Sequence, residues 1–411
     1  MEKNVDILVL GAGVTGLSVG SFLGDRDFLI LEKGNEVGGY CKTTIKNGFV
    51  WDYSGHFFHF KNQEIKDYVL ENLDCRIFTV EKKSHIYYKD RVIDFPFQNN
   101  IHQLEIDEFI ECLFDLSSSR DDNPVSFKDY IVQGLGKSIC DKFIIPYNEK
   151  LYGINLDDLD YDSMGRFFPK MESLESLLHL LKNRSKTSSY NDTFIYPEFG
   201  CFEFIKSIKK RVDDSKILTG VKVLSVDLEE KKVETTGGIF RFNKLISTLP
   251  FNYLLESSGQ PQNLSSNRVA VFNLGFDKPT KIESNWIYFP GDEIFYRVGF
   301  YNNIFDSSRM SLYVEIGLSQ DEIIDEEKTL RKVMEDLRRR GIVQDQNLIE
   351  SQFILMSPAY CHITKESKKF YSDWCEKWNK EGIYSIGRYG QWTYCSIEDN
   401  IIEAKELVKT I

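Results

Sequence analysis

The stretch VLGAGVTGLSVGSFL, residues 9–23, starts in an apolar strand, turns through a cluster of glycines and continues with the apolar spacing of a helix. Residues 28–31 predict a second apolar strand, which ends in Glu32. Two parallel strands need a crossover connection of about this length, so the stretch predicts a βαβ unit. The fold class that follows is α/β, with a Rossmann-like, doubly wound sheet at the start of the chain.

The glycines of this stretch are Gly11, Gly13 and Gly16, in GxGxxG order after a strand and before a helix. Gly11 permits a tight turn, Gly13 lets backbone N–H groups approach a pyrophosphate, and Gly16 lets the helix pack closely on the strand. The helix N-terminus favours the negative charge of the phosphates. Glu32 stands about 20 residues further on, where a carboxylate can bind a ribose hydroxyl. We therefore predict that a dinucleotide binds here.

Composition excludes several other classes of function. The formal net charge is −12, and the basic run Arg338–Arg340 predicts a solvated helix face, so we expect no nucleic-acid partner. Any anionic ligand must then be bound by a few local Arg or Lys side chains. The eight cysteines form no CxxC pair or Cys/His cluster, which indicates neither a metal site nor a disulfide framework. Without a leader-like start or an apolar run of about 18 residues, the chain is expected to be cytoplasmic and without a membrane span.

A chain of 411 residues is long enough for two packed regions. Short strands return at residues 220–249, whereas helical spacing follows residue 103 and strand-like runs occupy residues 269–316. A hairpin is expected at Ser84–Val92, turning at Lys89-Asp90. The expected division is a discontinuous dinucleotide-binding domain (1–75, 196–255 and 376–411), an inserted, mainly helical substrate region (76–195) and a second mixed sheet in the substrate domain (256–375).

The stretch after Glu32 contains Gly38-Gly39 and resembles the second fingerprint of the FAD-binding, glutathione-reductase-type fold, in its amine-oxidase branch. That resemblance implies FAD rather than NAD. Further stretches resemble the UDP-galactopyranose mutase family within this branch, and the similarity extends over most of the chain. They are YSGHFFH (53–59), PFQNNI (96–101), PYNEKLYG (146–153), WIYFP (286–290), PAY (358–360) and GRYGQWTY (387–394).

The resemblance implies roles for individual residues. His56 would lie near flavin N5, Arg297 would hold the substrate diphosphate, and Arg166 would lie near the sugar, although the family arginine falls one position later, at Phe167. The implied substrate-binding residues are Phe97, Gln98, Asn99, Asn148, Tyr152, Tyr360, Arg388 and Tyr394. The implied cofactor-binding residues are Gly11, Gly13, Gly16, Glu32, Lys33, Gly38, Gly39, Val223, Gly387 and Asp399. Ser396 stands where relatives often carry an acidic residue, and Asp399 is the nearby carboxylate.

The resemblance thus implies a FAD-dependent mutase that interconverts the pyranose and furanose forms of a UDP-sugar, with N5 of the reduced flavin as nucleophile. A reductant such as NAD(P)H and a homo-oligomeric state are further expectations. Two alternatives stay open. A flavin oxidase or desaturase of the amine-oxidase or protoporphyrinogen-oxidase kind shares both glycine fingerprints, and a flavin-binding protein without catalysis would account for Phe167 and Ser396. The sugar and the physiological electron donor are not specified.

Overall fold

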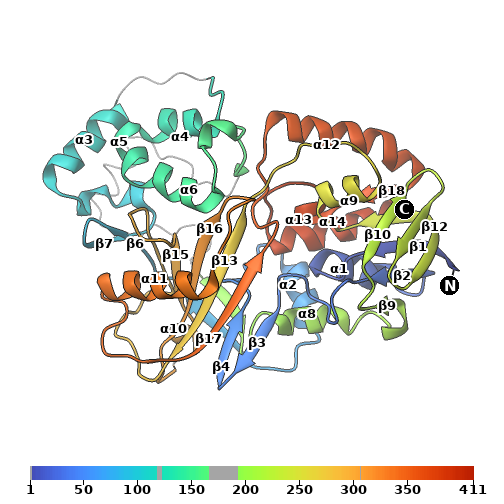
Figure 1. Cartoon of the computed structure of the whole chain (residues 1–411), viewed down its shortest axis with the longest axis horizontal. Helices are drawn as coiled ribbons and strands as arrows, with labels where there is room; N and C mark the ends of the chain where they lie inside the picture. Colours follow the sequence, from blue (N-terminus) through green and yellow to red (C-terminus); the bar gives the residue numbers. More distant parts are fainter. Residues whose placement is uncertain (1, 118–122, 166–192, 306) are drawn as a thin grey trace.

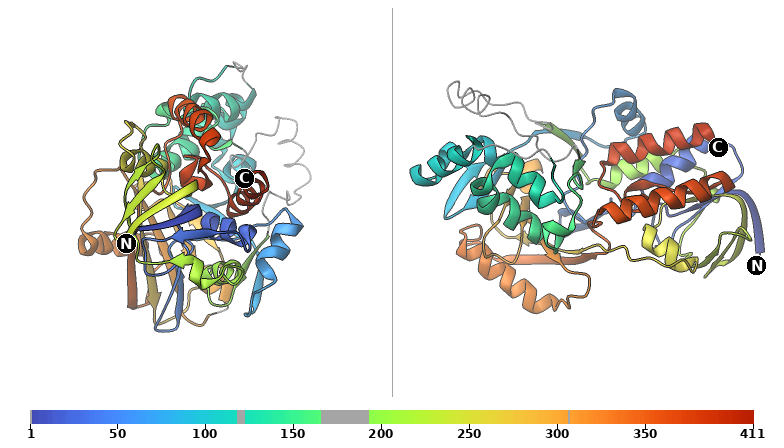
Figure 2. Two further views of the ribbon diagram at one scale, coloured as in Figure 1. Left: turned by 90° about the vertical axis from the view of Figure 1, so that its right-hand side faces the viewer. Right: turned by 90° about the horizontal axis from the view of Figure 1, so that it is seen from above.

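The computed structural model describes residues 2–117, 123–165, 193–305 and 307–411. These residues contain two seven-stranded sheets toward opposite ends of the molecule, with a group of helices beside the second sheet (Figure 1). The predicted α/β class and the βαβ unit at the start of the chain are both confirmed. Both termini lie at the end that holds the first sheet, as the further views also show (Figure 2).

The first sheet, called sheet A, contains the βαβ unit. Its strands are, in order, β10 (Val223–Asp227), β11 (Lys232–Thr235), β12 (Gly238–Ser247), β1 (Glu2–Leu10), β2 (Phe28–Leu31) and β9 (Ile217–Leu218), and β18 (Ile383–Ser385) also pairs with β12. Strand β1 is parallel to both neighbours, with Val9 opposite Ile30 on one side and Ile246 on the other. This pairing buries β1 in the centre of the sheet, as its continuous apolar run predicts.

Helices cover both faces of sheet A because its central strands are apolar on both sides. Ile7 and Val9 belong to the same apolar cluster as residues of α1 (Val14–Leu23) and α14 (Ile397–Thr410), which contact each other. On the other face, Leu8 and Leu10 cluster with residues of α9 (Phe251–Ser257) and α12 (Lys365–Trp378). The domain boundary expected at residue 376 therefore falls inside α12.

The second sheet, called sheet B, is mainly antiparallel. Its strands are, in order, β17 (Leu348–Met356), β13 (Arg268–Phe276), β16 (Ser311–Leu318), β15 (Arg297–Phe300), β14 (Trp286–Tyr288), β6 (Ser84–Tyr88) and β7 (Arg91–Asp94). The hairpin expected at Ser84–Val92 is confirmed as β6–β7, and its turn residues Lys89 and Asp90 have φ of 45° and 62°. Because β6 pairs in parallel with β14, this hairpin of the inserted region is part of the second sheet.

Side chains alternate across sheet B with the period of two that a strand imposes. On one face, Leu312, Val314 and Ile316 of β16 cluster with residues of α11 (Glu326–Arg339), which covers this face (Figure 1). The intervening residues of β16, Tyr313 and Glu315, therefore lie on the opposite face. Sheet B thus has one mainly apolar side and one side that carries polar groups.

The inserted region contributes the helices beside sheet B (Figure 2). They are α3 (Ile106–Ser117), α4 (Phe127–Leu135), α5 (Lys137–Ile139), a π-helical turn (Cys140–Ile144) and α6 (Ile145–Tyr152), preceded by short 3-10 turns at Phe97–Asn99 and Ile101–Gln103. Two small sheets pair β3 (Thr43–Lys46) with β4 (Phe49–Asp52) and β5 (Ile77–Glu81) with β8 (Thr193–Pro197). The remaining helices of the described ranges are α2 (Gln63–Leu70), α8 (Phe202–Lys209), α10 (Asn302–Phe305), α13 (Gly387–Gly390) and three 3-10 turns at Leu156–Asp158, Asp214–Lys216 and Asn379–Glu381.

Candidate functional site

The two glycine stretches of the sequence meet at the end of β1. Gly38 N donates to Ala12 O at 2.8 Å, and Gly11 N donates to Leu31 O at 2.8 Å. A Cβ atom on Gly39, whose φ is +59°, would lie 3.3 Å from Gly13 Cα. The two turns therefore approach each other through backbone alone, directly before the N-terminus of α1.

Glu32 holds this arrangement together. Its carboxylate accepts a hydrogen bond from Ala12 N at 2.9 Å and another from Gly34 N at 2.8 Å. Lys33 beside it is exposed. Val223 is buried in β10, and its carbonyl accepts a hydrogen bond from the Tyr253 hydroxyl at 2.8 Å. Glu32 thus lies at the glycine turns, whereas Val223 lies on the edge strand of sheet A.

The C-terminal loop closes on the same end of α1. Asn400 Oδ1 accepts hydrogen bonds from Thr15 Oγ1 at 2.9 Å and from Arg388 N at 2.8 Å. Gly387 has a φ of +85°, and a Cβ atom there would lie 2.7 Å from Thr15 Oγ1. The loop that carries Arg388 is therefore joined to the helix that follows the first glycine stretch.

Ser396 and Asp399 form the N-terminal cap of α14. Asp399 N donates to Ser396 Oγ at 3.1 Å, and Ser396 N donates to Asp399 Oδ2 at 2.8 Å, which together make a capping box. Ser396, which stands where relatives often carry an acidic residue, is thus the N-cap residue of α14, and Asp399 is its partner in the cap.

His56 lies near Arg297 and Glu315 of sheet B and near Arg388 of the C-terminal loop, whose charges all act on its ring. Its Nδ1 is 3.1 Å from Ser54 O, which places the proton of the neutral ring on Nδ1. The pKa of His56 is lowered to about 4, mainly by burial; the charges of Arg388 and Arg297 act in the same direction, and the Ser54 carbonyl and Glu315 act in the opposite direction. The imidazole is therefore neutral near pH 7, with Nε2 as an acceptor.

Arg297 lies on the polar side of sheet B beside Glu315, its partner in the β15–β16 register. Arg297 Nε donates to Glu315 Oε2 at 2.5 Å and Nη2 donates to Oε1 at 2.8 Å, and the Ser54 hydroxyl also donates to Oε1. Burial disfavours the charged carboxyl of Glu315, but Arg297 and Ser54 outweigh it and hold the pKa of Glu315 below its ordinary value. The predicted diphosphate arginine is thus paired with a buried carboxylate.

A second arginine lies in a group of tyrosines. Arg388 Cζ is 4.4 Å from the ring centre of Tyr394 and 5.4 Å from that of Tyr360, and these two rings stack at 6.1 Å. Tyr152 meets Tyr360 edge-on at 5.6 Å. Within the part of the chain that the structure describes, Arg388 has no carboxylate within ion-pair distance, and Nη1 donates to Cys395 O at 3.3 Å. The structure therefore brings four predicted substrate residues together around one uncompensated positive charge.

A separate stack of rings lies in the helical region. Phe97 stacks on Phe143 at 5.3 Å, and Phe143 stacks on Tyr147 at 5.3 Å. Gln98, in the same 3-10 turn as Phe97, is buried, and Asn99 is half-buried. Asn148 Nδ2 donates to Ile144 O at 2.7 Å, which uses one of the two N–H donors of this amide within the helical segment.

Several residues of this site were not predicted from the sequence. Glu315 is the clearest of these residues. It is an acidic residue inside the otherwise apolar run LYVEIGL, and this pattern indicates a buried charge that requires a partner. Tyr147 contacts the rings of Tyr288 and Tyr296 at 5.1 and 6.0 Å and also went unnoticed. Arg166 and Phe167 lie outside the described residues.

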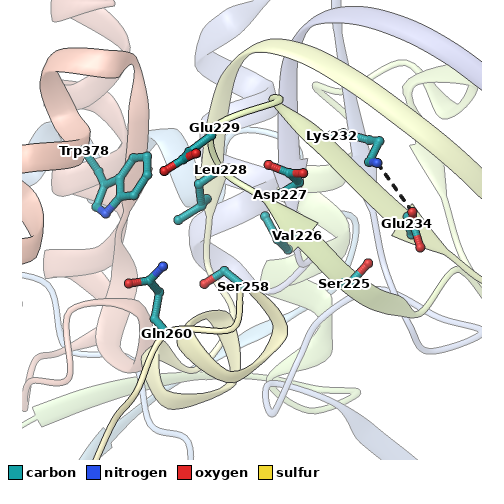
Figure 3. A pocket seen from close by; sticks show the side chains of 10 residues that line it. All are labelled: Ser225, Val226, Asp227, Leu228, Glu229, Lys232, Glu234, Ser258, Gln260 and Trp378. Carbon is teal, nitrogen blue, oxygen red and sulfur yellow. Dashed lines mark ion pairs between the residues drawn. The ribbon is translucent and has the colours of Figure 1, made fainter.

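A separate pocket opens on the outer part of sheet A (Figure 3). It has a volume of about 390 Å³ and is lined by β10, β11 and Trp378, with an ion pair of 3.7 Å between Lys232 and Glu234. Its lining includes none of the predicted site residues. The described ranges contain no helix with the length and apolarity that a bilayer crossing requires, and no group of three His, Cys, Asp or Glu side chains that could hold a metal ion.

The glycine turns fit a flavin dinucleotide. A Cβ atom on Gly16 would lie 1.9 Å from Gly11 O, so close contact of α1 with the first turn requires glycine. The same close approach leaves backbone N–H groups at the N-terminus of α1 for a pyrophosphate. The Glu32 carboxylate lies beside these turns, where it can accept a hydrogen bond from a ribose hydroxyl.

Comparisons with known proteins agree with this geometry. The fold is similar to that of a reduced UDP-galactopyranose mutase, with a TM-score of 0.91 and 21% identity over 98% of this chain and 93% of that chain. It is also similar to a protein from Exiguobacterium sp. 255-15 named after protoporphyrinogen oxidase (TM-score 0.77, 16% identity, 99% and 98% covered). A cyclohexylamine oxidase from Brevibacterium oxydans IH-35A has a TM-score of 0.71 and 12% identity, with 99% and 98% covered. Identities of this size show a shared fold alone.

The sequence itself matches the model of one family, described as flavin containing amine oxidoreductase, over residues 14–406. This match covers nearly the whole chain and includes the second glycine stretch, whereas Gly11 and Gly13 of the first stretch precede it. The chain therefore belongs to the family of flavin containing amine oxidoreductases, and its cofactor is FAD.

Proposed function

We propose that this chain is a FAD-dependent mutase that interconverts the pyranose and furanose forms of a UDP-sugar. The observation that carries the proposal is the placement of Arg388, whose guanidinium lies against the rings of Tyr360 and Tyr394 and has no carboxylate within ion-pair distance among the described residues. Arg297, which is paired with Glu315, is the second guanidinium of the site. In a chain with a net charge of −12, this local positive charge attracts a diphosphate. It repels the ammonium group of an amine substrate. The fold likeness to a reduced UDP-galactopyranose mutase supports the same choice.

The tyrosines around Arg388 suit the same ligand. Burial raises the pKa of Tyr360, so its hydroxyl remains a hydrogen-bond donor near neutral pH. Tyr394 stacks on Tyr360 and lies under the same guanidinium. Charge-assisted hydrogen bonds from Arg388 and hydroxyl donors together match the many acceptor oxygens of a diphosphate.

In this proposal the uridine binds at the ring stack of the helical region. Phe97 and Tyr147 supply flat apolar surfaces, and amides such as Gln98 and Asn148 carry both a donor and an acceptor for a uracil edge. Arg166 is proposed to lie near the sugar. The same proposal includes the glutathione-reductase type of sheet A and the predicted cofactor contacts. It also includes a reductant such as NAD(P)H, a homo-oligomeric state and a cytoplasmic location.

When bound and reduced, FAD supplies a nucleophilic nitrogen, N5. The chain's own residues have three tasks. Arg297 and Arg388 stabilise the negative charge of the departing diphosphate and keep it near for its return. His56, neutral and with Nε2 unprotonated, accepts a hydrogen bond or a proton at this atom. The aromatic residues around the site limit the access of water to the reacting carbon.

The test is a turnover experiment with the purified holoprotein. After anaerobic reduction with dithionite, the protein is incubated with UDP-galactopyranose, its N-acetyl analogue and UDP-arabinopyranose, and the products are separated by chromatography. We expect a furanose isomer of at least one of them from the reduced protein and none from the oxidised protein. Formation of hydrogen peroxide from an amine, with no isomer from any UDP-sugar, would establish the oxidase alternative instead.

A further inference from the structure

Helix α6 carries Tyr147, Asn148 and Tyr152, and its C-terminal carbonyls need partners because the helix itself supplies none. Leu151 O accepts a hydrogen bond from Asn267 Nδ2 at 2.6 Å. Tyr152 O lies 3.0 Å from His362 Nε2. Side chains from outside the helix therefore cap its last turn on two successive carbonyls.

Asn267 also binds the backbone of Tyr360. Its Oδ1 accepts a hydrogen bond from Tyr360 N at 2.7 Å, and its backbone N donates to Tyr360 O at 3.0 Å. The residue is completely buried, with an exposed fraction of 0%. One amide side chain thus joins the end of α6, through Leu151, to the backbone of Tyr360.

His362 acts beside it on the next carbonyl. Its Nδ1 lies 2.9 Å from Ser265 Oγ, and its backbone N donates to Ser265 O at 2.9 Å. Burial lowers the pKa of His362 and favours the neutral ring. The ring can then accept from Ser265 at Nδ1 and donate to Tyr152 O from Nε2. This pairing determines both the tautomer and the orientation of the ring.

The helix has little freedom to settle elsewhere. A Cβ atom on Gly317 would lie 1.9 Å from Lys150 O, so the last turn of α6 rests directly on the backbone of β16. Lys150 Nζ also donates to Phe289 O at 3.0 Å and to Gly291 O at 3.0 Å, in the turn that precedes β15. Backbone contact thus sets the distance between α6 and sheet B. The position of α6 relative to Tyr360 depends on Asn267 and His362.

We propose that Asn267 and His362 are positioning residues for the substrate site: together they place Tyr152 against Tyr360, the edge-on pair beside Arg388. The inference rests on the proposed function, since the ligand that this pair would hold is a uridine diphosphate. Neither residue is expected to touch the ligand. Their effect is to keep the nucleoside end of the site, on α6, in register with the phosphate end, at Tyr360 and Arg388.

The experiment measures the Kd for UDP by calorimetry on the FAD-loaded protein, together with the FAD-to-protein ratio and the thermal midpoint. Asn267→Ala and His362→Ala are each expected to raise the Kd for UDP by about tenfold, with unchanged FAD content. Each substitution leaves one C-terminal carbonyl of α6 without its buried hydrogen bond, so the end of the helix is no longer held in place. His362→Gln is expected to stay within about threefold of the wild type, since the Gln amide can still donate to Tyr152 O.

Asn273→Ala is the matched control. Asn273 is also completely buried, lies in β13 close to Asn267 in sequence, and donates from Nδ2 to Asp52 O at 2.9 Å. It is expected to lose comparable stability with no change in the Kd for UDP. If Asn267→Ala yields no holoprotein, the comparison of His362→Ala with His362→Gln decides.

Three results would overturn the inference. The first is an unchanged Kd in both alanine variants, and the second is an equal rise in the Asn273→Ala control. The third is an equal loss in His362→Gln and His362→Ala, which indicates that packing of the imidazole rather than its hydrogen bond matters. A wild-type holoprotein that does not bind UDP would refute the proposed function before any variant is compared, and the inference with it.

Discussion

Glu315 accepts two hydrogen bonds from Arg297, across the neighbouring strands β15 and β16, at 2.5 and 2.8 Å. The Glu315 side chain is almost wholly buried, with 1% exposed, whereas the Arg297 side chain retains 19%. An ion pair of this kind is costly to break from one side, because the remaining charge is left in a poorly solvated place. The pair therefore fixes Arg297 while leaving part of it accessible to a ligand.

Replacement of Glu315 by Gln is expected to lower the free energy of unfolding by about 3 kcal/mol, because Arg297 then keeps a buried charge without a counter-ion. Urea unfolding followed by circular dichroism measures the change. Glu283→Gln is the control, since the pair of Glu283 with Lys83 is exposed at 81% and 50% and contributes little. Equal losses in the two variants would contradict the assigned role of the buried pair.

His56 is expected to make the protein less stable in mild acid. Its pKa in the folded state is about 4, below the ordinary value of 6.5. The unfolded state therefore binds more protons between these values, and stability falls as the pH is lowered from 6.5 toward 4. The His56→Gln variant should lose up to about 3 kcal/mol less than the wild type over this range. Urea unfolding at several pH values measures the difference.

His102 supplies the control for this pH dependence, because it is exposed on a 3-10 turn of the helical region. The His102→Gln variant should follow the wild-type curve. Parallel curves for the wild type and the His56→Gln variant would show that His56 does not titrate in the expected range.

Gly16→Ala is expected to abolish FAD binding. The added Cβ would lie 1.9 Å from the backbone oxygen of Gly11, so the first glycine turn must move away from α1. The ratio of flavin absorbance to protein absorbance after purification measures the loss. Gly24→Ala is matched to it: Gly24 ends the same helix with a φ of +59°, and its added Cβ meets nothing within 4 Å. It should cost about 1 kcal/mol of stability and retain FAD. Full flavin content in Gly16→Ala would refute the assignment of the cradle.

Arg388 is expected to contribute both charge and shape to ligand binding. Arg388→Lys keeps the charge but loses the planar group over Tyr394, and should raise the Kd for UDP by about tenfold. Arg388→Met removes the charge as well and should raise it by about a hundredfold. Calorimetric titration of the FAD-loaded variants measures both values. Arg76→Lys, which changes an arginine over the ring of Phe78 at 4.7 Å outside the site, should bind UDP as the wild type does. Similar affinities in all three variants would exclude Arg388 from the site.

The nucleotide-binding unit could be predicted from the sequence because its signals are local. The apolar run of β1, the glycines and the helical spacing of α1 lie within about 25 consecutive residues, and each has one preferred geometry. The hairpin β6–β7 is equally local, since its turn at Lys89-Asp90 needs left-handed backbone. Such elements are determined before any tertiary contact forms.

The second sheet could be predicted only as a sheet. Its strand β6 pairs with β14, about two hundred residues later in the chain, and no local pattern specifies that partner. The role of Glu315 could not be predicted for the same reason. Its partner Arg297 is identified by strand register, and register depends on pairing across the sheet rather than on spacing along the chain. The single acidic residue in an apolar strand indicated a partner without saying which.

The alternation of sheet B separates two kinds of evolutionary change. Residues that pack against α11 maintain the fold, and the residues between them, such as Arg297 and Glu315, lie on the opposite face, where we propose that the ligand binds. Substitutions at every second position can therefore alter the chemistry without disturbing the apolar layer. A one-residue insertion in β15 or β16 would exchange the two sets and destroy both.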